Sequence, residues 1–115
     1  MADKRSLYSV PAGSDEALIE ARARAGLERI AQAIRSHPGT GQVRHLVAFV
    51  AGCYNSGDFP FDLSELRGLD RELSDACLDV LSFDRLGRRE IHHLLPGGER
   101  ELHQWLEDYG LLKQE

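Results

Sequence analysis

Features that would assign a chemistry are missing from this chain. No apolar run is long enough to cross a membrane, and the opening residues MADKRSLYSVPAG lack the apolar centre of a signal peptide. We therefore expect a cytoplasmic protein that does not bind membranes. No convincing stretch alternates apolar and polar residues as a half-buried strand does, so the pattern predicts an all-α protein.

Cysteine is scarce, and so are histidine pairs with metal-binding spacing. Cys53 and Cys77 each lie on an apolar helical face without a Cys-x-x-Cys partner, which predicts two reduced core residues. His103 follows Glu99 by four residues, but no second pair of this kind completes a set of four ligands. Ser56 lacks the strand-to-helix turn of serine nucleophiles. We expect no metal, no cofactor and no enzymatic activity.

Basic residues are too few for nucleic-acid binding to be expected, because the net charge is −5 and phosphate must be neutralised by Lys and Arg. Acidic residues gather instead between positions 58 and 84. One interpretation is a solvated surface, and the sharper one is a docking face for a basic partner protein, mimicking nucleic acid. The candidate face consists of Glu72, Asp75, Asp79 and Asp84.

Apolar residues at three- and four-residue spacing predict a compact bundle of four main helices with a short extra helical turn. The first two predicted helices run from a cap at Ser14 to a break at His37, and from Gly41, after a cap at Thr40, to Ser56. The last two run from a cap at Asp70 to Gly87, and from Glu99 to Tyr109 with Gly110 as terminator. We expect residues 1–13 to form a flexible arm and residues 14–115 a single domain. The short connection at residues 37–40 favours an antiparallel hairpin of the first two helices.

The extra turn is predicted after a Pro/Phe-rich loop. Asp62 and Glu65 have the spacing of a capping box, in which Glu65 reaches back to the Asp62 amide, and Gly68 ends the turn. Phe59 and Phe61 are expected to fold back onto the core. Residues 87–95 are expected to be irregular with one short turn.

Two further surfaces are candidates for binding. Thr40, Gly41 and Arg44 stand at a predicted helix start, where first-turn amides and a guanidinium attract anions, so a small anion or nucleotide is one candidate ligand. Trp105 and Tyr109 lie on one face of the last helix. They either close the bundle or form the seam of a homodimer, since aromatic residues are enriched at such contacts.

Residues 40–70 read TGQVRHLVAFVAGCYNSGDFPFDLSELRGLD. The run resembles the core of an uncharacterised bacterial domain family associated with plasmids and integrative elements of proteobacteria. Its pattern is met by Thr40, Gly41, Gln42, Arg44, Tyr54, Asn55, Phe61, Asp62, Leu63, Leu66, Leu69 and Asp70. The similarity is absent before His37 and thins after Leu81. The resemblance implies a mobile-element origin and carries no activity.

The sequence therefore predicts a small non-enzymatic protein-interaction module. The alternatives are an acidic inhibitor of a host nuclease or anti-phage complex, and an anion- or nucleotide-binding protein that uses residues 39–45.

Overall fold

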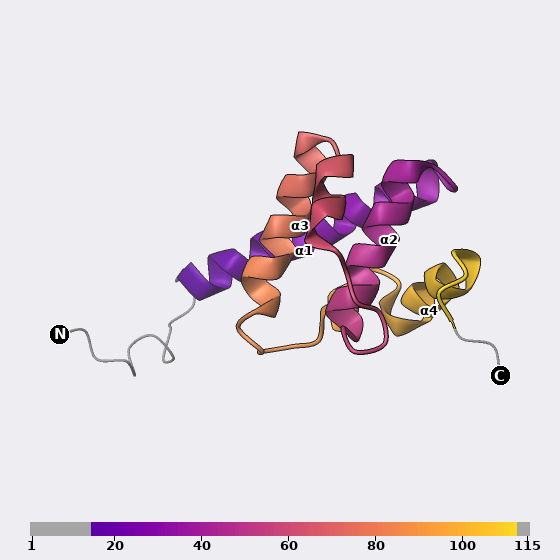
Figure 1. Cartoon of the computed structure of the whole chain (residues 1–115). Helices are drawn as coiled ribbons and strands as arrows, with labels where there is room; N and C mark the ends of the chain where they lie inside the picture. Colours follow the sequence, from indigo (N-terminus) through magenta and orange to yellow (C-terminus); the bar gives the residue numbers. More distant parts are fainter. Residues whose placement is uncertain (1–14, 113–115) are drawn as a thin grey trace.

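The computed structural model describes residues 15–112, and this part of the chain is helical without strands. The elements in chain order are α1 (Asp15–Ser36), α2 (Gly41–Tyr54), the 3₁₀ turn η2 (Leu63–Gly68), α3 (Arg71–Asp84), the 3₁₀ turn η3 (Ile91–His93) and α4 (Gly98–Asp108). The prediction of four main helices with a short extra turn is confirmed (Figure 1). The expected arm at 1–13 and the cap at Ser14 lie outside the described residues. No helix within 15–112 is long and apolar enough to cross a membrane.

The longest helix, α1, packs chiefly against α3. The two backbones approach closely at Gly26, where a Cβ atom would lie 2.8 Å from the carbonyl oxygen of Ala76. The predicted antiparallel hairpin of α1 and α2 is not the main pairing, because α2 contacts α1 only sparsely and runs across it in Figure 1. The prediction was wrong because it relied on the length of the connection alone. The close approach that Gly26 permits makes α3 the main neighbour of α1.

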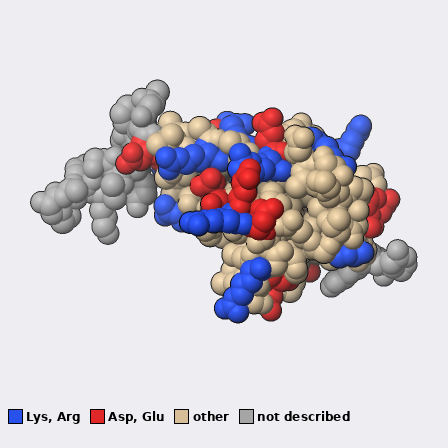
Figure 2. Space-filling view, turned by 90° about the horizontal axis from the view of Figure 1, so that it is seen from above, with Lys and Arg blue, Asp and Glu red and all other residues tan. Residues whose placement is uncertain are grey.

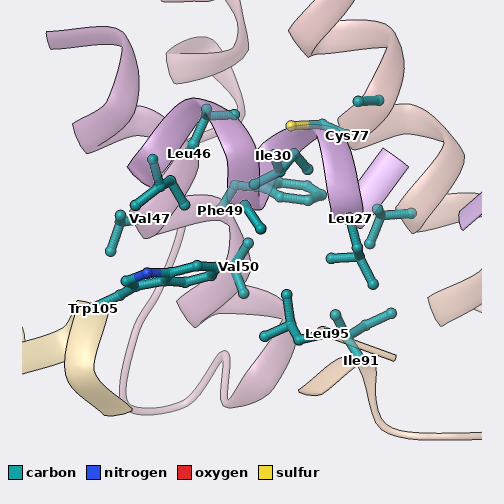
Figure 3. Packing of buried hydrophobic residues seen from close by; sticks show 14 of the residues in the cluster. Leu27, Ile30, Leu46, Val47, Phe49, Val50, Cys77, Ile91, Leu95 and Trp105 are labelled. Carbon is teal, nitrogen blue, oxygen red and sulfur yellow. The ribbon is translucent and has the colours of Figure 1, made fainter. Parts of the chain in front are cut away.

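The central helix α2 is buried on most of its circumference. Its buried residues Leu46, Val47, Phe49 and Val50 face residues from α1, α3, η3 and α4 (Figure 3). The helix ends at Tyr54, two residues before the predicted end. The loop that follows folds back as expected, because Phe59 and Phe61 pack on the core and the Phe61 ring meets Phe49 edge-on at 5.6 Å.

Polar side chains cap α2, η2 and α3, whereas α4 begins after Gly97 without a side-chain cap. Thr40 caps α2 and Asp70 caps α3, each accepting a hydrogen bond from an amide three residues on. Asp62 caps η2 through the Ser64 amide, yet the predicted return bond of Glu65 is not formed. The Glu65 carboxylate lies 3.0 Å from Nδ1 of His45 instead. Glu65 therefore pairs with a residue of α2 and does not complete the local capping box.

The last helix, α4, closes one end of the core. Its buried face consists of Leu102, Trp105 and Leu106, and Figure 3 shows the Trp105 ring lying against Val50. Gly110 follows with φ of 70°, the left-handed conformation that ends a helix at low cost. The predicted boundaries of α4 and the short turn within 87–95 are confirmed to within a residue or two.

Candidate functional site

A cleft of about 710 Å³ opens where the end of α1, the start of α2 and α4 meet. Figure 1 shows this corner at the opposite end of the molecule from the start of α1. Ile34, Pro38 and Trp105 contribute apolar atoms to its wall, and three arginines line it: Arg35, Arg44 and Arg100. Its volume falls within the range of about 300 to 1,000 Å³ typical of ligand pockets.

Both acidic residues of the cleft already have partners. Glu101 forms a two-pronged pair with Arg35, with both N–O distances at 2.7 Å, and its Oε1 also accepts a hydrogen bond from the Gly97 amide. Asp108 accepts a hydrogen bond of 2.8 Å from the Gln104 side chain. Arg35 is thereby neutralised by a residue of α4, and this pair joins α1 to α4.

The other two arginines are differently placed. Arg44 and Arg100 are exposed and form no ion pair with any residue in the described range. The Arg44 guanidinium lies over the Tyr109 ring, 5.7 Å from its centroid. The Tyr109 hydroxyl accepts a hydrogen bond of 2.9 Å from the Gly39 amide. Two positive groups thus stand at an apolar cleft on a protein whose net charge is −5.

The predicted anion site at Thr40, Gly41 and Arg44 overlaps this cleft only through Arg44. The Thr40 hydroxyl accepts from the Val43 amide and donates to the His37 carbonyl, so it is fully occupied by the cap. Gly41 is exposed at the start of α2. Anion binding at these residues stays a prediction, and the structure leaves Arg44 as the group best able to serve it.

The predicted dimer seam also touches this corner. Trp105 is only 5% exposed and packs inside the core, whereas Tyr109 is half-buried and borders the cleft. The seam stays a prediction, and it would have to rely on Tyr109 and its neighbours because little of the Trp105 ring is accessible.

The four residues of the predicted acidic face differ in exposure and in ion pairing. Glu72 pairs with Arg29 of α1 at 3.2 Å, and Asp84 is half-buried. Burial, reinforced by the nearby Glu90 charge, raises the pKa of Asp84 above its ordinary value. Asp75 is exposed and Asp79 half-buried. Figure 2, which looks down on the molecule, shows acidic and basic side chains interleaved. Docking through these acids stays a prediction, and the Arg29 guanidinium offsets the charge of one of them, Glu72.

A polar cluster that the sequence did not predict joins α2 to α4. The Tyr54 hydroxyl donates to Oε2 of Glu99 at 3.1 Å and lies 3.3 Å from Nε2 of His103. Desolvation and the Glu99 carboxylate raise the pKa of Tyr54. The Glu99 and His103 spacing was visible in the sequence, whereas Tyr54 lies 45 residues before Glu99 and gave no signal. Within residues 15–112 no group of three or more His, Cys, Asp or Glu is arranged to hold a metal ion.

The two cysteines are free thiols. Burial raises the pKa of both Cys53 and Cys77 to about 12, with the Asp84 charge adding to the shift at Cys53. Thiols of this kind stay protonated at neutral pH and are poor nucleophiles. The prediction that they act as small core residues agrees with this burial.

Fold and cleft together define a small all-helical domain with an arginine-lined groove at one corner. The chain matches the Family of unknown function (DUF7673) over residues 24–110 and belongs to that family. The resemblance to an uncharacterised domain family is thereby confirmed, and it extends further than the sequence suggested, from within α1 through α4. Searches among curated proteins and solved structures found no match.

Proposed function

We propose that this chain is a non-enzymatic protein-interaction module and that it binds its partner through the cleft between α1, α2 and α4. The observation that carries the proposal is the pairing of apolar wall with Arg44 and Arg100, which have no ion-pair partner within the described residues. Arginine and aromatic residues are enriched at protein interfaces. We also propose that the protein is encoded on a mobile genetic element, as the sequence resemblance implies.

The residues at the cleft support binding better than catalysis. Among the described residues its lining includes no cysteine, serine or histidine, and the two carboxylates there are engaged by neighbouring side chains. A general acid or base needs a group free to exchange a proton with a substrate. A surface that presents exposed arginines and apolar atoms instead suits recognition of another chain.

The test is affinity capture of the full chain in a lysate of its source organism, followed by mass spectrometry. The cleft variant Arg44→Glu with Arg100→Glu is compared with Asp75→Lys with Asp79→Lys, a matched pair of charge reversals on α3. A partner lost only with the cleft variant supports the proposal. A partner lost only with the α3 variant contradicts it and supports the acidic inhibitor.

A further inference from the structure

We infer that the partner enters the cleft with a short acidic peptide segment, which places a carboxylate between Arg44 and Arg100 and a bulky apolar side chain against Pro38 and the small accessible parts of Ile34 and Trp105. This inference rests on the proposed function and adds the chemistry of the partner to it.

The charges at the cleft favour an acidic segment. Of the five charged side chains at the cleft, Arg35 and Glu101 neutralise one another, and Asp108 is bonded to Gln104. Arg44, Arg100 and Asp108 are exposed and have no ion pair among the described residues, so two positive charges against one negative charge leave the cleft with a net positive charge. A segment with Lys or Arg would meet like charge here, whereas Asp or Glu would find two guanidinium donors.

Contacts within the protein orient Arg44 before any partner binds. Its guanidinium is held over the Tyr109 ring, and that ring is fixed by the hydrogen bond from Gly39 to the hydroxyl. A guanidinium whose face rests on an aromatic ring keeps its N–H edge for two parallel bonds to a carboxylate. Less conformational freedom is lost on binding when the donor is already positioned. Tyr109 is thus a positioning residue for Arg44.

The bonding of the 37–40 loop favours a peptide over a phosphate or nucleotide. A phosphate cradle in the cleft needs several free backbone amides, but the Gly39 amide that lines it donates to Tyr109, and the first residues of α2, Gly41 and Gln42, are not among the described lining residues. A nucleobase needs an open aromatic face, yet Arg44 covers one face of Tyr109 and Trp105 is 5% exposed. What stays available is side-chain guanidinium and aliphatic surface, which matches an Asp or Glu beside a Leu, Ile or Phe.

The experiment is a selection of random heptapeptides displayed on phage against the full immobilised chain, followed by fluorescence titration of the best synthetic peptides. Enriched peptides are expected to combine Asp or Glu with a bulky apolar residue. Arg44→Gln and Arg100→Gln are each expected to weaken them about tenfold, the equivalent of losing one charge-assisted hydrogen bond. Arg29→Gln, on the α1 surface outside the cleft lining, serves as the matched control and should leave the affinity unchanged.

Four results would overturn the inference. Three concern the peptides: none is enriched, the enriched ones lack acidic residues, or their affinity is unchanged by both arginine substitutions. The fourth is saturable thermal stabilisation by inorganic phosphate or ATP that Arg44→Gln abolishes. A dimer mass in light scattering that becomes a monomer mass in Arg44→Glu would also overturn it, because a second copy would then occupy the cleft.

The failure of this inference is separable from failure of the proposed function. If the lysate partner is lost with the Arg44→Glu and Arg100→Glu variant while the selected peptides lack acids, the interaction module stands and only the acidic chemistry fails. If neither lysate partner nor peptide depends on the cleft, the proposed function itself fails.

Discussion

The guanidinium of Arg44, in the first turns of α2, lies 5.7 Å from the centroid of the Tyr109 ring at the end of α4. The same tyrosine accepts the Gly39 amide through its hydroxyl. One side chain therefore ties the loop before α2 to the last helix and positions a cation at the mouth of the cleft.

Tyr109→Phe separates these two roles. It removes the hydroxyl that accepts the Gly39 amide but keeps the ring beneath Arg44, so the free energy of unfolding should fall by about 1 kcal/mol. Urea denaturation of the variant and the parent protein measures this difference. Tyr109→Leu also removes the ring and should cost more, by about 0.5 to 1 kcal/mol for the lost cation–π contact at an exposed site. Equal stability of all three proteins would contradict the arrangement.

The close approach of α1 and α3 predicts that Gly26 does not tolerate a methyl group. In Gly26→Ala the new Cβ would lie 2.8 Å from a backbone oxygen, and backbone cannot yield as a flexible side chain does. We expect overpacking to cost about 1 to 3 kcal/mol and to outweigh the gain of about 1 kcal/mol in helix propensity. Gly41→Ala is the matched control, since nothing lies within 4 Å of a Cβ there. Thermal unfolding should show a lower midpoint for the first variant and an unchanged or higher midpoint for the second.

The junction between η2 and α3 depends on Asp70, which caps α3 through the Leu73 amide while its own amide donates to the Gln42 side chain. Asp70→Ala should lower the free energy of unfolding by about 1 kcal/mol, the usual cost of losing an N-cap. Asp70→Asn keeps a capping oxygen and should cost little. Chemical denaturation of the two variants distinguishes the cap from a general effect of charge, which both substitutions remove.

Buried thiols predict a loss of stability in alkaline solution. The pKa values of Cys53 and Cys77 are raised from 9.0 to about 12 in the folded protein. Above pH 9 the unfolded chain releases thiol protons that the folded protein retains, so the free energy of unfolding should fall as pH rises from 9 towards 12. The slope is at most about 1.4 kcal/mol per pH unit for each thiol.

Denaturation at about pH 8 and about pH 10 measures this dependence. The double variant Cys53→Ala with Cys77→Ala should be less stable at the lower pH but show a shallower decline. Tyr54, whose pKa is also raised, contributes a remaining slope near the upper end of the range. An unchanged slope in the double variant would contradict the assignment to the thiols.

Local chemistry explains what the sequence could predict. The caps at Thr40 and Asp70 and the terminator at Gly110 act on residues a few positions away, so their sequence context contains the whole interaction. Glu65 shows the limit of this reasoning, because its capping partner was local but His45 on another helix binds its carboxylate. Tertiary partners override local ones wherever the fold brings them within reach.

The cleft depends on tertiary partners that the local sequence does not reveal. Arg35 and Glu101 are 66 residues apart, and their pairing decides which cations remain at the cleft, yet no spacing rule connects them. Sequence reasoning identified Arg44 and Tyr109 separately, one as part of an anion site and the other as part of a dimer seam. Arg100 was not singled out at all, because an exposed arginine on a polar helix face gives no signal until α4 is placed beside α1 and α2.

Hydrogen–deuterium exchange of the full chain, alone and saturated with its captured partner or a selected peptide, locates the binding surface. We expect slower exchange in residues 34–44 and 97–109, which form the cleft, with little change in 70–84. Slower exchange confined to residues 70–84 would contradict it and place the partner on the acidic residues of α3.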